Sequence, residues 1–131
     1  MNPLKPITFA LLTVCAPFAA SANDADLSKQ YAACMDKSGG VTVAMIECIT
    51  AEHQRQDVRL NKAYKALMAD LNPERKKQLQ AVQRAWLKYR DGNCSFYDDP
   101  DGGTLARVSA NNCMMTSTAS RARELEGFMQ R

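Results

Sequence analysis

The dipeptide Asn72-Pro73 divides the middle of the chain into two long amphipathic stretches. Before it, from Val43 to Leu71, apolar residues return mostly three, four or seven positions apart, which is the pattern of one helix face. Asparagine suits an N-cap and proline the first helical position, where its missing N–H is not needed. The sequence therefore predicts a hairpin of two long antiparallel helices that pack on each other. The second helix should run to about Asn93, with these residues on one face: Leu79, Val82, Trp86 and Tyr89.

Two further helices are expected beside this hairpin. A short helix over 27–35 precedes it, and Ser38-Gly39-Gly40 forms a loop before Thr42, which is expected to cap the long helix. After the break at Gly102-Gly103, Thr104 is expected to cap a third long helix over 105–129, whose face is weakly apolar. No segment alternates with period two. The predicted fold class is all-α, a small antiparallel bundle of one short and three long helices.

Residues 1–22 have the features of a removable signal peptide. One lysine precedes an almost unbroken apolar run over 7–20, and Ala20-Ser21-Ala22 supplies the small residues that signal peptidase accepts. We predict cleavage after Ala22, which leaves a mature domain over 23–131. No segment has the roughly 20 apolar residues of a transmembrane helix. Cys15 is disfavoured as a lipid-attachment site because Val14 stands where a small residue is expected. We therefore expect a soluble, exported protein.

The expected mature domain has an even number of cysteines: Cys34, Cys48, Cys94 and Cys113. In a small exported domain such a set indicates two disulfides. A zinc site is disfavoured because no two cysteines stand in CxxC spacing and the chain has a single histidine. Of the three pairings, we prefer Cys34 with Cys48 and Cys94 with Cys113, since each bond closes a modest loop across a glycine-containing connection. A bond between Cys48 and Cys94 stays open, because the two lie nearly level on the predicted hairpin.

The charge balance gives little indication of a partner. The chain has 17 lysines and arginines against 14 aspartates and glutamates. Such a small net charge does not indicate that the partner is a nucleic acid or another acidic polymer. We expect no cofactor and no metal.

Several motifs follow one another along the chain: CIxAEHxRQDxRLNxAYKALMADL at 48–71, LxxVQRAWLKYRDGNC at 79–94, GGT at 102–104, Cys113, and TASRARELE at 118–126. In this order and spacing they resemble the small exported domain named after the lysozyme inhibitor LprI. The resemblance covers nearly all of the expected mature chain. It implies a cysteine-stapled helical domain outside the cytoplasm, with lysozyme inhibition reported for the family's namesake.

Five polar residues of these motifs are interpreted as a structural network: Asp57, Asn61, Gln83, Arg90 and Asp91. Asp57 lies 15 residues before the turn at 72 and Arg90 lies 18 after it, so the two are expected to meet across the hairpin. Trp86 and Tyr89 are expected in the core. His53 and Asp57 stand at i and i+4 and suit a shared proton or metal, but no nucleophile and no third ligand is evident. We therefore interpret His53 as structural and expect no enzymatic activity.

The stretch YRDGNCSFYDDPDGGT, residues 89–104, is the strongest candidate for binding a partner. Its aspartates do not follow the order of a calcium loop. A solvated turn is one interpretation. The functional interpretation is an acidic loop that blocks the cleft of a cationic lysozyme, with three contacts and two anchors. The contacts are Asp98, Asp99 and Asp101, and the anchors are Phe96 and Tyr97.

The expected function is therefore that of a periplasmic, lysozyme-inhibitor-like protein of a Gram-negative bacterium. The alternative is an envelope adaptor or immunity-type protein that binds a bacterial partner without catalysis. Its candidate surface is a group of basic residues around the first hairpin turn: Lys62, Lys65, Arg75, Lys76 and Lys77. The sequence does not indicate an oligomeric state.

Overall fold

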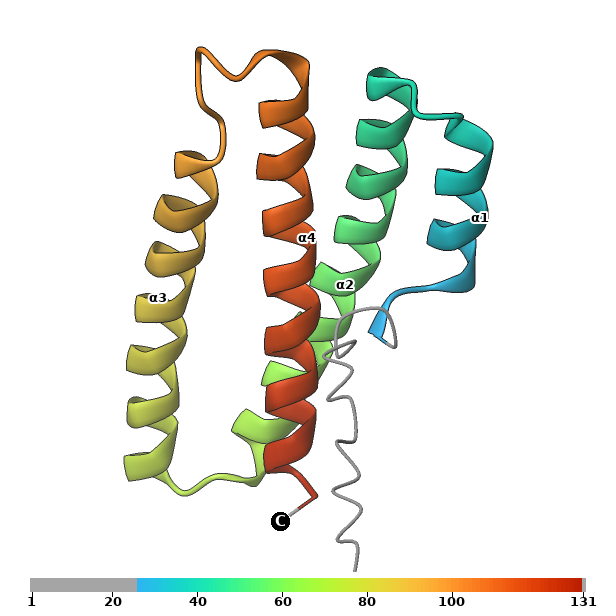
Figure 1. Cartoon of the computed structure of the whole chain (residues 1–131). Coiled ribbons are helices and arrows are strands. Elements are labelled where there is room, and N and C mark those ends of the chain that lie inside the picture. Colours follow the sequence, from blue (N-terminus) through green and yellow to red (C-terminus); the bar gives the residue numbers. More distant parts are fainter. Residues whose placement is uncertain (1–25, 131) are drawn as a thin grey trace, which may run out of the picture.

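The computed structural model describes residues 26–130 and consists of four helices joined by short connections (Figure 1). They are α1 (Lys29–Ser38), α2 (Thr42–Asp70), α3 (Pro73–Phe96) and α4 (Gly103–Phe128). No strand occurs between residues 26 and 130. The predicted bundle of one short and three long helices is confirmed. The expected signal peptide, with its cleavage after Ala22, lies outside the described residues.

Helix α4 lies between α2 and α3 (Figure 1). Successive helices run in opposite directions, so α2 and α4 run the same way, and this parallel pair forms the main contact of the bundle. Helix α1 packs on α2, and α3 joins the bundle mainly through α4. The expected direct packing of the two hairpin helices along their length is therefore wrong, because α4 separates them.

Small side chains allow α4 to occupy this central position. Four of its residues are small and buried: Ala106, Thr118, Ala119 and Ala122. Met115 and Leu125 of the same helix are fully buried. A helix enclosed by two neighbours buries more than one face, so it lacks the single apolar stripe of a surface helix. This explains why the third long helix has a weak apolar pattern in the sequence.

The helix starts agree only in part with the expected caps. Asn72 is the N-cap of α3 and its side chain accepts from the backbone N–H of Arg75 at 2.9 Å, as predicted. Thr42 and Thr104 are not caps, because α2 begins one residue earlier than expected, after Val41, and α4 begins two residues earlier, after Gly102. Tight turns cause both shifts. Val41 N bonds to the carbonyl of Ser38, and Gly102 N to that of Asp99, each at 3.0 Å.

The buried stripe of α3 is displaced by one position from the predicted face. Its buried residues are Leu79, Gln83, Arg90 and Cys94, with Trp86 half-buried between them. Val82 is 53% exposed and Tyr89 67% exposed, so the expected place of Tyr89 in the core is wrong. Apolar periodicity missed the stripe because two of its members are polar.

The apolar core and the disulfides stabilise opposite ends of the bundle. Near the α2–α3 connection, one cluster joins Leu60, Ala63 and Leu67 of α2 to Leu79 of α3 and to Ala122 and Leu125 of α4. At the other end, disulfides join Cys34 to Cys48 and Cys94 to Cys113, with Cα–Cα distances of 5.7 and 5.4 Å. The preferred local pairing is confirmed.

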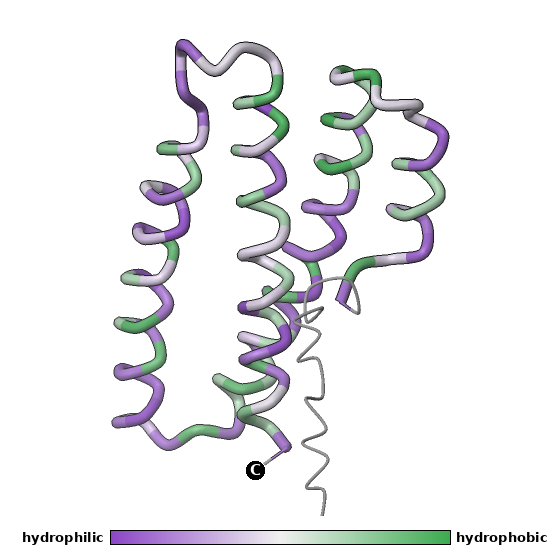
Figure 2. The backbone as a smooth tube through the Cα atoms, viewed as in Figure 1, coloured by the Kyte–Doolittle hydropathy of each residue, from purple (hydrophilic) through white to green (hydrophobic). Residues whose placement is uncertain are grey.

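Hydrophilic residues interrupt the apolar ones along every helix (Figure 2). Within residues 26–130, no helix combines the length and the apolar character that crossing a membrane requires.

Candidate functional site

The α1–α2 and α3–α4 connections lie at the same end of the bundle (Figure 1). We call this end, residues 34–48 and 94–113, the disulfide end, because one disulfide spans each connection. Cys94 is completely buried and Cys48 is 3% exposed. Each disulfide links the two helices on either side of one connection. Both loops are therefore short and held in place by a covalent bond.

Large apolar side chains are exposed on both sides of the α3–α4 loop. Phe96 ends α3 and is 87% exposed, and Tyr97 beside it is 50% exposed. Leu105, in the first turn of α4, is 67% exposed. The two aromatics are the anchors expected from the sequence. Leu105 was not expected, although it is an apolar residue directly after the GGT motif. Exposed apolar side chains gathered at a braced loop are typical of a protein-binding surface.

The three aspartates of this loop are all exposed. Asp99 Oδ1 accepts a hydrogen bond from the backbone N–H of Asp101 at 2.9 Å, so this carboxylate shapes the turn. Across the part of the chain that the structure describes, Asp98, Asp99 and Asp101 take part in no salt bridge. Arg107 lines a pocket together with Asp98 and Asp99 and is the neighbouring cation. The loop therefore presents a net negative charge beside exposed apolar groups.

The five residues of the expected polar network form three separate contacts. Asn61 Nδ2 donates to Asp57 Oδ2 at 3.0 Å within α2. Arg90 pairs with Asp91 at 2.8 Å within α3. Gln83 accepts from Arg121 Nε of α4 at 3.0 Å. Between residues 26 and 130 no hydrogen bond or ion pair joins Asp57 to Arg90, although Asp57, Asn61 and Gln83 line one pocket between α2 and α3.

Thr118 of α4 connects α2 and α3 instead. Its side chain is completely buried, and Arg90 Nη1 of α3 donates to its Oγ1 at 3.2 Å. His53 Nε2 of α2 lies 3.2 Å from the same oxygen. Burial lowers the pKa of His53, and the charge of Arg90 acts in the same direction, while Asp57 and Asp91 oppose it. The arrangement suits a neutral imidazole that takes part in packing three helices.

Glu52 ties the start of the described chain to α2. Its side chain is completely buried and accepts from the Ser28 backbone N–H, the Ser28 hydroxyl, Arg55 Nε and Gln56 Nε2. Burial alone raises the pKa of Glu52, but the hydrogen bonds from Ser28, Gln56 and Arg55 outweigh burial and lower it. Ser28 also caps α1 by accepting from the backbone N–H of Tyr31. One carboxylate therefore orients both the N-terminal segment and α1.

A second ion pair joins α2 to the end of α4. Arg59 binds both carboxylate oxygens of Glu126, at 2.8 and 2.6 Å. The hydrogen bond from Arg59 lowers the pKa of Glu126. Arg59 also lies 3.6 Å from the carboxylate of Asp26. Glu52, Thr118 and the pair of Arg59 with Glu126 were not predicted, although the sequence motifs contain all four residues. The sequence does indicate the burial of Glu52 and Thr118, because these polar residues share a helix face with buried apolar ones. Glu52 and Gln56 lie on the same face of α2 as Ile49 and Leu60.

The basic residues proposed for the alternative function lie at the end opposite the acidic loop, around the α2–α3 connection. Four are exposed, namely Lys62, Lys65, Arg75 and Lys77, and Lys76 is half-buried. In the described part of the chain, no three histidine, cysteine, aspartate or glutamate side chains are grouped so that they could hold a metal ion.

Comparison with known proteins identifies a family and a relative of this chain. The family model described as "Lysozyme inhibitor LprI" matches residues 34–125. The chain is also similar to "Uncharacterized protein R02472" from Rhizobium meliloti (strain 1021), with 27% identity over 97 residues that cover 63% of this chain and 70% of that protein. No solved structure matches the chain significantly.

Proposed function

Because the chain belongs to the LprI lysozyme inhibitor family, we propose that it binds a lysozyme through the disulfide end and blocks it without catalysis. The family match over residues 34–125 supports inhibition, and the exposure of Phe96 on a braced loop supports the location of the contact. The match includes both disulfides and the whole α3–α4 loop.

Phe96 is the proposed central anchor. An aromatic side chain that is 87% exposed can bury most of its area on binding. Because phenylalanine has only a few rotatable side-chain bonds, it loses little conformational entropy when binding fixes it. Tyr97 and Leu105 widen the apolar contact. The disulfide from Cys94 to Cys113 limits the motion of the loop before binding, which lowers the entropy lost in the complex. These features suit a preformed plug for a cleft.

The charge of the loop supports the choice of partner. Lysozymes are generally cationic, and they cleave cell-wall glycan with a pair of carboxyl groups in a long cleft. Asp98, Asp99 and Asp101 present negative charge toward such a surface. Complementary charge increases the association rate more than the affinity, and salt screens the effect. We therefore expect association that slows as the ionic strength rises.

We also propose that the protein acts in the periplasm of a Gram-negative bacterium after removal of residues 1–22. The two disulfides support an oxidising compartment. A lysozyme that enters the envelope meets an inhibitor there before it reaches the cell wall.

The charge hypothesis is tested by reversing Asp98 and Asp101 to lysine while leaving Asp99, whose carboxylate shapes the turn. The matched control reverses Asp70 and Glu74, two exposed acids at the opposite end of the bundle. Both variants change the net charge equally. Surface plasmon resonance against the inhibited lysozyme should show association about tenfold slower for the loop variant at low salt, and a much smaller change for the control. Equal slowing in both variants would mean that net charge, and not this loop, directs association.

The anchor hypothesis is tested by Phe96→Ala, with Val58→Ala as the control. Val58 lies on α2 and is 70% exposed. Neither change removes a core contact, so both variants should melt like the parent protein. Phe96→Ala should weaken lysozyme binding by about tenfold or more, mainly through faster dissociation. Unchanged affinity in this variant would remove Phe96 from the interface.

A further inference from the structure

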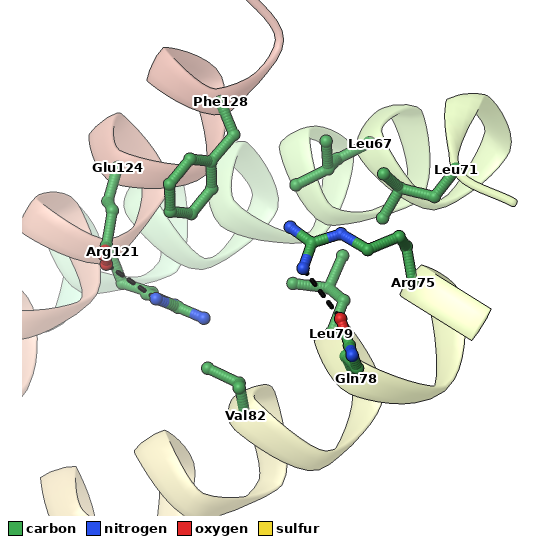
Figure 3. Close-up of a pocket in the computed structure, with 9 residues that line it drawn as sticks. All are labelled: Leu67, Leu71, Arg75, Gln78, Leu79, Val82, Arg121, Glu124 and Phe128. Atoms are coloured by element: carbon green, nitrogen blue, oxygen red, sulfur yellow. Dashed lines mark hydrogen bonds and ion pairs between the residues drawn. The ribbon is translucent and has the colours of Figure 1, made fainter.

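A pocket of about 430 Å³ lies at the end of the bundle opposite the acidic loop (Figure 3). It is lined by the end of α2, the start of α3 and the end of α4, and is partly open to solvent. Its apolar walls are formed by Leu67, Leu71, Leu79, Val82 and Phe128. Pockets of this size and apolar character are typical of sites for small ligands.

Arg121 of α4 lines this pocket, and its buried guanidinium carries an unpaired donor. The residue is only 5% exposed. Its Nε donates to Gln83 at 3.0 Å and its Nη1 to Glu124 at 2.6 Å, whereas Nη2 is buried and has no hydrogen-bond acceptor among residues 26–130. The guanidinium also faces the ring of Trp86, 5.8 Å from its centroid. Figure 3 shows the guanidinium directed toward Val82. Buried N–H groups are rarely left without an acceptor, so this one favours a ligand oxygen.

The charges around the pocket define the ligand further. Arg121 and Arg75 are cationic, and Glu124 is the acid of the lining, which leaves one net positive charge. Arg75 is exposed and bonds to Gln78 at 2.7 Å, so its guanidinium lies at the pocket and remains hydrated. A cation is repelled by this arrangement. A neutral apolar molecule leaves Arg121 Nη2 unpaired, and Glu124 opposes a second negative charge on a ligand. A single carboxylate matches best.

We propose that this pocket binds a small amphiphile with one carboxylate, such as a medium-chain fatty acid. The carboxylate accepts from Arg121 Nη2 and lies near Arg75, and the hydrocarbon chain packs between Leu67, Leu79 and Phe128. The site is at the other end of the bundle from the lysozyme-binding surface proposed above, and it does not depend on that function.

The ligand class is tested by isothermal titration calorimetry of the oxidised mature protein, residues 23–131. Three probes share a ten-carbon chain and differ in the head group: decanoate, 1-decanol and decyltrimethylammonium, each used below its aggregation limit. Decanoate should bind saturably with one-to-one stoichiometry, and about tenfold more tightly than the alcohol or the cation. Equal binding of all three probes, or no binding of decanoate, would overturn the proposal.

The location is tested by Val82→Glu, with Val58→Glu as the matched control. Both valines are exposed on helices, at 53% and 70%, so both variants should fold, which circular dichroism checks. The new carboxylate at position 82 lies in the pocket, where it can pair with Arg121 and repel decanoate. Decanoate affinity should fall about tenfold in Val82→Glu and stay unchanged in Val58→Glu. An equal effect in both variants would show that decanoate binds elsewhere.

Discussion

Glu52→Gln tests whether a buried carboxylate organises the N-terminal part of the bundle. Each oxygen of Glu52 accepts two hydrogen bonds. Ser28 N and Gln56 donate to Oε1, and Ser28 Oγ and Arg55 donate to Oε2. An amide keeps one of these acceptors and replaces the other with a donor. The substitution preserves the size of the side chain while it removes two of the four bonds and the negative charge.

The expected loss of stability is about 2–3 kcal/mol. A hydrogen bond to a charged group contributes roughly 1.5–3 kcal/mol to the stability. The loss of two such bonds costs less than twice this amount, for two reasons. The Arg55 side chain is 42% exposed, so water replaces much of that interaction. The Ser28 hydroxyl can also rotate to accept from the new amide. For a domain of about 100 residues, each kcal/mol lowers the melting temperature by about 4 °C, so a decrease of about 10 °C follows.

Thermal unfolding followed by circular dichroism, with both disulfides intact, measures this change. Glu47→Gln is the control, since Glu47 is exposed on the same helix, and it should change the stability by less than about 0.5 kcal/mol. The pH dependence adds a second criterion. The pKa of Glu52 is lower in the folded state than its usual 4.5, so its stabilisation is present above that value and is lost as the pH falls through the folded pKa.

The difference between the wild-type protein and Glu52→Gln should therefore be largest near pH 7 and should shrink in acid. Equal melting temperatures at pH 7 would refute the reasoning. A difference that stays constant down to about pH 2 would show that the substitution acts through its shape and not through the lost charge.

Two further stability predictions concern the contacts between helices. Replacing both Cys94 and Cys113 with serine opens a disulfide with a sequence separation of 19, and should lower the free energy of unfolding in urea by about 3 kcal/mol; an unchanged midpoint would contradict this. The Arg59 and Glu126 side chains are 29% and 32% exposed. A double-mutant cycle with alanine should give a coupling energy of about 0.5–1 kcal/mol that decreases in 1 M salt, whereas zero coupling would show that this bidentate pair does not stabilise the fold.

The sequence predicts the helices well because their signals are local. The Asn72-Pro73 cap, the glycine-containing breaks and the spacing of apolar residues each act within a few positions of the chain. The local disulfide pairing follows for the same reason, since each bond closes a short connection. The helix ends differ by one to three residues: α1 covers Lys29–Ser38 where 27–35 was predicted, α3 continues to Phe96, and tight backbone turns take the place of threonine caps at the starts of α2 and α4.

The packing order was less predictable because it depends on contacts between distant residues. A two-helix hairpin joined by a short connection normally packs on itself, and nothing local indicates that α4 separates the pair. The buried stripes of α2 and α3 contain Glu52, Gln56, Gln83 and Arg90, which apolar periodicity counts as surface. Their burial depends on Thr118, Arg121 and Ser28, which lie far away in the sequence.

The candidate site was predicted in part. Exposure of Phe96, Tyr97 and the aspartates agrees with a loop that the sequence marks with proline and glycines. The pocket beside Arg121 was not predicted, because three helices that meet at their ends form it, and its unpaired donor is a property of three-dimensional packing.

The most direct test of the proposed function is a cell-wall lysis assay. The oxidised protein without residues 1–22 is titrated against chicken-type, goose-type and invertebrate-type lysozymes. We predict saturable inhibition of one class, and its loss in the Phe96→Ala variant. Absence of inhibition in all three classes would contradict the proposal and favour an envelope adaptor, whose endogenous partner would then be sought by pulldown from envelope extract.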